Sequence, residues 1–342
     1  MAKKGSAFVR LMMDFDFSRA EWFDAARGSL VTAAIFLVLA LTGNTDDILP
    51  LSLGAVLVAV AESGLPFGRR WRTMLWTTVW LMVALLVGVA VSASPLLTIA
   101  ITVPVAFVCG AVGYLGPRAA VAGLLSLVVF AAYAGAPISI DTAPKEAALL
   151  GLGGLLQTVV CVIVGVIRHR GSLLALDEVH HARPTVLRTT QQAFLRHGVR
   201  LAVVMGVATA ISELVSIPHA YWLPVAVAWM TRPDRDGTVS RVVQRLAGTA
   251  LGVVIIGVPG WILGTGPAFY IVFALIGSTI AIAFVWVNYH IGVAGVTIWL
   301  LAIIGLDGSP LGEDIFLRIG LTVCGALLVL LGTYIWRDRT VH

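Results

Sequence analysis

Residues suited to binding an organic anion gather around one short apolar segment, residues 219–230, with the sequence HAYWLPVAVAWM. The segment begins with aromatic rings and a proline, Tyr221, Trp222 and Pro224, and a basic turn follows it and ends at Arg245. Arginine offers a planar, two-pronged set of N–H donors that matches a carboxylate. A helix that begins inside the membrane also leaves free amides, which attract anions. We therefore predict an anion-binding site here.

The same markers occur in the first half of the chain, at an offset of 172 to 174 residues by subtraction. The pairs are Arg27 and Arg200, Pro50 and Pro224, Arg72 and Arg245, Pro95 and Pro267, and Pro137 and Pro310. Because each half holds six apolar segments, both halves enter the membrane from the same side. This predicts a parallel repeat, related by an axis along the membrane normal.

The offset extends the predicted site to both halves. The predicted substrate-binding residues are Arg72, Arg245, Trp222, Tyr221, Pro224, Pro50, Arg27 and Arg200. We expect Arg72 and Arg245 to face each other across one cytoplasmic vestibule. Each group also has an alternative to substrate binding. The arginines could instead set the membrane topology and attract anionic lipids, at about 1 kcal/mol each. The aromatic residues could instead form a belt at the membrane interface, with the prolines at helix starts.

A second group of residues could carry protons. Its members are Glu213, His219, His290 and Arg318. Ionisable groups at membrane depth are costly and often functional, and histidine changes charge between about pH 5 and 8. All four lie near segment ends, so contact with lipid headgroups is the alternative. No metal-ligand spacing, phosphate loop or nucleophile motif occurs, so we predict no metal, no cofactor and no enzyme activity.

Composition places these residues in a polytopic membrane protein. The chain is 59% hydrophobic and 12% charged, against about 25% charged in soluble domains. We predict an all-α protein with twelve transmembrane helices in two six-helix repeats. The predicted divisions are 1–27 (an amphipathic segment), 28–167 (first repeat), 168–198 (cytoplasmic linker), 199–336 (second repeat) and 337–342 (tail). The second and eighth spans, 48–61 and 220–230, are short enough to be re-entrant.

Charge distribution predicts the orientation. The net charge of +5 comes from arginines near the termini, the linker and alternate loops, whereas the remaining loops are mainly acidic. Positive loops stay in the cytoplasm. We therefore expect an inner-membrane protein with both termini cytoplasmic, contacts with anionic lipids and no nucleic-acid partner. A homo-oligomer is left open.

The stretch YWLPVAVAWMTRPD, followed by RVVQRLAGTALG, resembles the signature of the fusaric acid resistance family, and NYHIGVAGVTIWLL resembles a later segment of it. The resemblance covers the second half, and the first half matches only through the repeat. Unlike many members, the chain shows no large cytoplasmic domain. The resemblance implies export of aromatic or other organic acids, as in the aromatic acid exporters. The plant aluminium-activated malate channels are similar and pair two six-span units, which implies a covalent pseudo-dimer here.

The predicted function is therefore export of organic anions, in particular aromatic or amphipathic carboxylates, driven by the proton gradient. Two alternatives are a passive anion channel that resembles the malate channels, and a membrane protein of the envelope that interacts with lipid and transports nothing.

Overall fold

The computed structural model describes residues 22–62, 67–136, 138–169 and 188–336. Within these ranges the chain forms twelve α-helices and two short 3-10 turns, so the predicted all-α class is confirmed. Residues 1–21 of the predicted amphipathic segment, most of the predicted linker and the tail lie outside the described residues.

The helices follow the apolar segments of the sequence. The first half contains α2 (Trp22–Thr42), η2 (Thr45–Asp47), α3 (Ile48–Glu62), α4 (Phe67–Val91), α5 (Pro95–Ala111), η3 (Val112–Leu115), α6 (Pro117–Gly135) and α7 (Ala143–His169). The second half contains α8 (Arg188–Leu214), α9 (Trp222–Met230), α10 (Arg235–Leu263), α11 (Pro267–Phe284), α12 (Tyr289–Leu306) and α13 (Leu311–Ile335). Three of the helices begin with proline, whose missing N–H costs nothing at a first position. Helix α8 starts at Arg188, inside the predicted linker.

Ten helices in the described residues are long and apolar enough to cross a membrane. The other two are α3, with 15 residues, and α9, with 9 residues. At 1.5 Å per residue they measure about 22 and 14 Å, short of the roughly 30 Å hydrocarbon core. Ten of the twelve predicted transmembrane helices are thus long and apolar enough to cross the membrane. The second and eighth segments are short, as predicted.

The two short helices are the most enclosed elements. All nine residues of α9 and 13 residues of α3 are buried. Helix α3 packs against α7, α2 and α4, and α9 packs against α13, α8 and α6. A helix that is apolar on every side is stable only when other helices surround it. The longer helices instead leave large apolar side chains exposed, such as Trp261 and Phe316, as expected for surfaces facing lipid.

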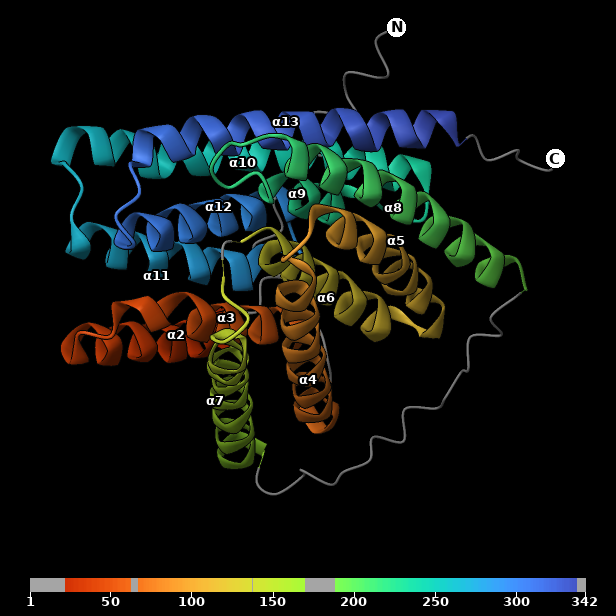
Figure 1. Ribbon diagram of the computed structural model, residues 1–342. Helices are drawn as coiled ribbons and strands as arrows, with labels where there is room; N and C mark the ends of the chain where they lie inside the picture. The colour runs from red at the N-terminus through yellow and green to blue at the C-terminus, as the bar shows by residue number, and fades with distance from the viewer. Residues whose placement is uncertain (1–21, 63–66, 137, 170–187, 337–342) are drawn as a thin grey trace, which may run out of the picture.

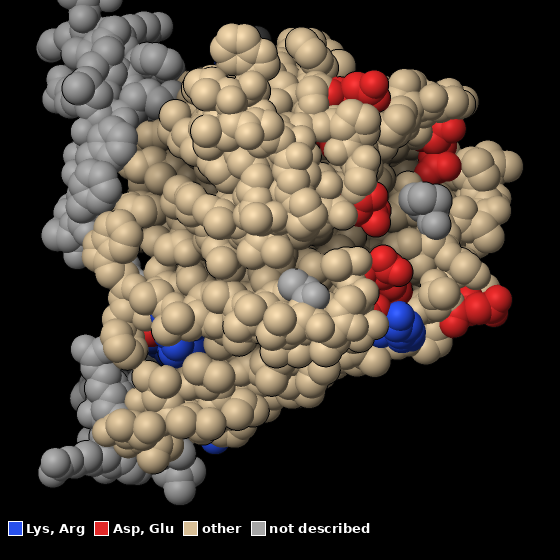
Figure 2. Space-filling model, turned by 90° about the vertical axis from the view of Figure 1, so that its left-hand side faces the viewer, with Lys and Arg blue, Asp and Glu red and all other residues tan. Residues whose placement is uncertain are grey.

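Charged groups mark two ends of the fold. The acidic end includes Asp46, Asp47 and Asp307, and acidic side chains gather on the face shown in Figure 2. The basic end includes Arg27, Arg70, Arg200 and Arg232. Helix α3 runs from Asp47, which pairs with Lys145 at 2.7 Å, to Glu62, which pairs with Arg27.

Helices from the two halves are interleaved. In the second half α10 and α13 lie side by side, as do α11 and α12, and in Figure 1 α4 and α7 lie across their direction. Helix α5 of the first half packs along α8 of the second, and α2 packs against α11. At the α5–α8 contact Gly110 meets Gly198, where an added Cβ would lie 3.0 Å from the opposite Cα. These contacts enclose α3 and α9 between the halves.

Candidate functional site

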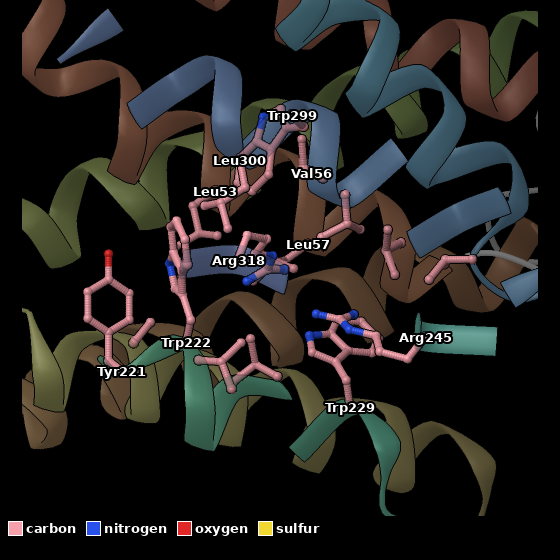
Figure 3. A pocket seen from close by; sticks show the side chains of 16 residues that line it. Leu53, Val56, Leu57, Tyr221, Trp222, Trp229, Arg245, Trp299, Leu300 and Arg318 are labelled. Atoms are coloured by element: carbon pink, nitrogen blue, oxygen red, sulfur yellow. The ribbon is translucent and has the colours of Figure 1, made fainter. Parts of the chain in front are cut away.

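A cavity of about 80 Å³ lies where α3 and α6 face α9, α10, α12 and α13 (Figure 3). Its polar groups come from two arginines, Arg245 of α10 and Arg318 of α13. Four aromatic residues line it, and aliphatic side chains form the rest of the wall. The aromatic residues are Tyr221, Trp222, Trp229 and Trp299. We refer to this space as the central cavity.

Both guanidinium groups are buried without a counter-ion in the described part of the chain. Arg245 and Arg318 are each 1% exposed. The Nε and Nη2 atoms of Arg245, and the Nε and Nη1 atoms of Arg318, have no hydrogen-bond partner among the described residues. The Arg318 guanidinium lies 5.2 Å from the Trp222 ring, and that of Arg245 lies 5.9 Å from the Trp229 ring. Cation–π contacts of this kind contribute about 0.5–2 kcal/mol each.

These contacts do not offset the cost of burying two cations. A buried donor without an acceptor costs about 1–3 kcal/mol, and an unpaired buried charge costs several kcal/mol. Trp222 and Trp299 add further unsatisfied groups, because their Nε1 atoms also have no partner in the described residues. An anion with several acceptor oxygens would satisfy donors from both arginines. The central cavity is therefore suited to binding an anion.

Arginines and aromatic rings alternate from the basic end towards this cavity. Arg241 lies 3.7 Å from the centre of the Tyr289 ring, and that ring lies 6.5 Å from Trp229. Trp229 contacts Arg245, one helical turn beyond Arg241 on α10. We call the three pairs Arg241–Tyr289, Arg245–Trp229 and Arg318–Trp222 the arginine–aromatic column. It connects the basic end with the buried anion-binding groups.

A histidine–carboxylate pair lies at the other end of the column. His219 Nε2 is 3.4 Å from Asp314 Oδ1, and His219 Nδ1 is 3.2 Å from the Tyr221 hydroxyl. The His219 ring stacks on Trp222 with 4.7 Å between centroids and an angle of 10°. Burial lowers the pKa of His219 below its usual value, although Asp314 and Asp307 oppose this effect.

The backbone at His219 is strained. Its φ angle of 55° lies in the left-handed region, which costs a residue other than glycine about 1–3 kcal/mol. Such a conformation persists only where the surroundings impose it. Stacking on Trp222 and the contact with Asp314 are the interactions that hold the ring in this position.

A separate ion cluster lies at the basic end of the first half. Arg27 forms a close ion pair with Glu62, and the two side chains are 5% and 1% exposed. Arg70 binds Asp24 at 2.6 Å, and the Cys161 thiol donates to Glu62 at 3.1 Å. Each cation here has a carboxylate partner, in contrast to Arg245 and Arg318. This cluster ties α2, α3, α4 and α7 together.

The structure brings only part of the predicted site together. Tyr221, Trp222 and Arg245, three of the residues predicted to bind substrate, line the central cavity. Arg72 does not, because it is exposed and its guanidinium lies against the neighbouring Trp71 ring. Arg318, which was predicted to carry protons, faces Arg245 across the cavity in its place.

The remaining predicted residues lie elsewhere. Arg27 is occupied by Glu62, and Arg200 donates to the carbonyl groups of Arg232 and Pro233. Pro50 and Pro224 are buried within α3 and α9, outside the cavity lining. His290 is buried near the start of α12, and Glu213 is partly exposed at the end of α8.

Four residues of these sites were missed from the sequence: Asp314, Trp229, Trp299 and Glu62. Two of them had a signal. Trp229 follows Trp222 by seven residues, which places both rings on one face of a helix. Asp314 precedes Arg318 by four residues, the spacing of interacting side chains on a helix. Glu62 and Trp299 are single residues in or beside apolar runs, and only packing identifies their partners.

The fold and the cavity together define a multi-pass α-helical membrane protein with a buried cationic site. Residues 207–332 match the family described as fusaric acid resistance protein-like, which confirms the resemblance expected from the sequence. This stretch includes every member of the arginine–aromatic column and the His219–Asp314 pair.

Three curated relatives illustrate the similarity. The chain is 31% identical over 150 residues to the uncharacterized protein ORF2 of Neisseria gonorrhoeae, covering 43% of this chain and 36% of that protein. It is 28% identical over 176 residues to the inner membrane protein YccS of Escherichia coli K12, and the match covers 48% of this chain and 24% of that protein. It is 26% identical over 137 residues to the uncharacterized protein slr1298 of Synechocystis, and the match covers 40% of this chain and 18% of that protein. The chain thus spans about a third or less of the length of these relatives. No solved structure matches it.

Proposed function

We propose that this protein transports organic anions across the inner membrane, in the direction of export, and that Arg245 and Arg318 bind the carboxylate in the central cavity. The observation that carries the proposal is two buried guanidinium groups that face one cavity without an acidic partner in the described residues. A protein that only spans a membrane has no reason to keep such charges inside.

The cavity lining favours an anion with an aromatic or apolar body. Tryptophan and tyrosine rings surround the two arginines, and aliphatic side chains complete the wall. The present volume of about 80 Å³ is smaller than the roughly 150 Å³ that holds benzene in an engineered cavity. A substrate with an aromatic ring therefore binds in a conformation in which the surrounding helices have separated. Such a change between conformations is what a transport cycle requires.

The two halves are proposed to form a parallel pseudo-dimer with cytoplasmic termini. The reciprocal packing of α5 on α8 and of α2 on α11 supports this arrangement, because α5 and α11, and α2 and α8, are equivalent under the repeat. The segregation of acidic and basic groups supports the orientation, with the basic end in the cytoplasm. The similarity to the inner membrane protein YccS supports the choice of the inner membrane.

A passive anion channel is the second candidate. It is favoured by the arginine–aromatic column, which offers an anion successive cationic positions from the basic end inward. The two candidates differ in energy source. Flux that follows the membrane potential and ignores a pH gradient supports the channel, whereas flux driven by a pH gradient supports proton-coupled export.

The test is efflux of radiolabelled benzoate from vesicles that contain the purified protein. The Arg245→Gln variant should raise the apparent benzoate constant about tenfold or more, because a hydrogen bond to a charged group contributes about 1.5–3 kcal/mol. Arg72→Gln is the matched control, with the same substitution at the repeat-related, exposed position. Unchanged benzoate affinity in both Arg245→Gln and Arg318→Gln would refute the proposed site.

A further inference from the structure

Asp314 and Arg318 are buried, oppositely charged and one helical turn apart, yet they do not form an ion pair with each other. Asp314 is 2% exposed, and its Oδ2 atom has no hydrogen-bond partner in the described residues. An acid four residues before a base is the favourable order on a helix. Helical side chains also lean towards the N-terminus, so the Arg318 guanidinium leans towards the turn that holds Asp314. A change of side-chain conformation would join the two groups.

His219 holds the other oxygen of Asp314. Its Nε2 atom faces Asp314 Oδ1, and its ring lies flat against Trp222. Trp222 in turn contacts the guanidinium of Arg318 at 5.2 Å. His219, Trp222 and Arg318 thus form a continuous set of contacts, and both His219 and Arg318 are candidate partners for the same carboxylate.

We propose that Asp314 is an internal counter-ion that competes with the transported anion for Arg318, and that protonation of His219 holds Asp314 away from that arginine. This inference rests on the proposed function, because it takes Arg318 as a binding residue. When His219 is protonated, its ion pair with Asp314 leaves Arg318 free for the anion. When His219 is neutral, Asp314 turns to Arg318 and displaces the anion. Asp314 and His219 are positioning residues, since neither contacts the substrate.

The groups around His219 allow this switch. Asp314 on α13 and Asp307 at the end of α12 are the charges that act on His219, whereas Glu313 and a hydrogen bond from Ser309 act on Asp314. Glu313 and Asp307 are exposed, so solvent screens them, whereas Asp314 is buried and interacts more strongly. From α6, Tyr133 lies near Tyr221 and contacts Glu146 at 3.5 Å. These neighbours leave Asp314 as the buried acid within reach of both His219 and Arg318.

The first test measures benzoate binding by calorimetry to the full chain in lipid nanodiscs, at about pH 5.5 and pH 8. Benzoate stays ionised over this range, and the series is extended to about pH 5 because burial lowers the pKa of His219 below its usual value. Wild type should bind roughly tenfold more tightly at the lower pH, within the 5- to 150-fold range of typical coupling between sites. Asp314→Asn should bind tightly at both pH values, and His219→Gln should bind weakly at both. Asp141→Asn, an exposed acid before α7 and outside the set, should keep the wild-type pH dependence.

The second test needs no ligand. The pKa of His219 is measured by NMR of histidine-labelled protein, with its signal assigned by its absence from His219→Gln. Arg318→Gln should raise this pKa, because Asp314 then pairs with His219 alone. Loss of the positive charge of Arg318 would also raise the His219 pKa directly, because the two cations no longer repel each other. The effect of Arg318→Gln on the His219 pKa is therefore measured again in the Asp314→Asn background. Competition for Asp314 predicts that the effect of Arg318→Gln is largely lost there.

The outcomes separate this inference from the proposed function. If wild type binds benzoate and Arg318→Gln does not, but Asp314→Asn keeps the wild-type pH dependence, the counter-ion is refuted and the binding site stands. If wild type binds no benzoate, the proposed site is refuted for aromatic carboxylates, and the histidine titration decides the counter-ion by itself. If Arg318→Gln shifts the His219 pKa equally in the wild-type and Asp314→Asn backgrounds, His219 and Arg318 do not compete for Asp314, and the inference is refuted.

Discussion

At a pH low enough to protonate His219, where Asp314 pairs with that histidine, replacing Arg318 by methionine should stabilise the ligand-free protein while it abolishes anion binding. Methionine keeps most of the side-chain length and removes the buried charge. The wild-type side chain has two unpartnered donors, at about 1–3 kcal/mol each. The variant loses the contact with Trp222, which contributes about 0.5–2 kcal/mol. The net gain should be about 1–4 kcal/mol, because the cost of the two unpartnered donors exceeds the contribution of the contact with Trp222.

Thermal unfolding in detergent, with and without benzoate, measures both effects. A ligand at a hundred times its dissociation constant should stabilise wild type by about 2.7 kcal/mol, and the Arg318→Met variant should not respond. Lys145→Met is the matched control, because Lys145 occupies the position 173 residues earlier but is exposed and paired with Asp47. An Arg318→Met variant that melts below wild type without ligand would show that the fold itself satisfies this arginine, and the reasoning would fail.

Three further outcomes are expected in thermal unfolding. Glu62→Gln should lose about 3 kcal/mol, the lower end of the cost of breaking a buried ion pair, because Arg27 keeps only its longer contact with Asp24 at 3.8 Å; a loss below 1 kcal/mol would mean that the ion cluster contributes little. Gly54→Ala should lose about 1–3 kcal/mol, because an added Cβ would overlap a carbonyl group of α7, whereas Gly312→Ala has open space and should match wild type. His219 has a folded pKa below that of the unfolded chain, so the unfolded state binds more protons as the pH falls below about 6.5 and stability decreases. His219→Gln should therefore lose less stability than wild type between about pH 7 and pH 5, and an equal loss would contradict this assignment.

The short interior helices illustrate what could be predicted from local pattern. The apolar runs at 48–61 and 220–230 are too brief to cross the hydrocarbon core, and they became α3 and α9. Apolar length and composition also predicted the other ten helices, because in lipid the backbone must satisfy its own hydrogen bonds within each segment. The motif around Trp222 and Arg245 was sufficient to predict the family and part of the site.

The partners of the charged residues depended on packing. Arg72 and Arg245 are equivalent by the 173-residue offset, yet one is exposed and the other is buried beside the cavity. A sequence offset identifies equivalent positions in the two halves. It does not predict which helices pack around each of those positions. Arg245 lies in the interior because α3 and α6 of the first half close over α9, α10 and α13.

The same reason explains Arg27 and Arg318. Arg27 was predicted to bind substrate, but Glu62, 35 residues away in sequence, neutralises it where α2 meets α3. Arg318 was predicted to lie near a membrane surface, but the packing of α13 on α10 places it opposite Arg245. The sequence by itself determined which segments enter the membrane and which family the second half resembles, since both depend on residues close together in the chain. Only the tertiary structure decided which cations are neutralised and which have no acidic partner in the described residues, because electrostatic interactions inside the membrane depend on contacts between helices far apart in sequence.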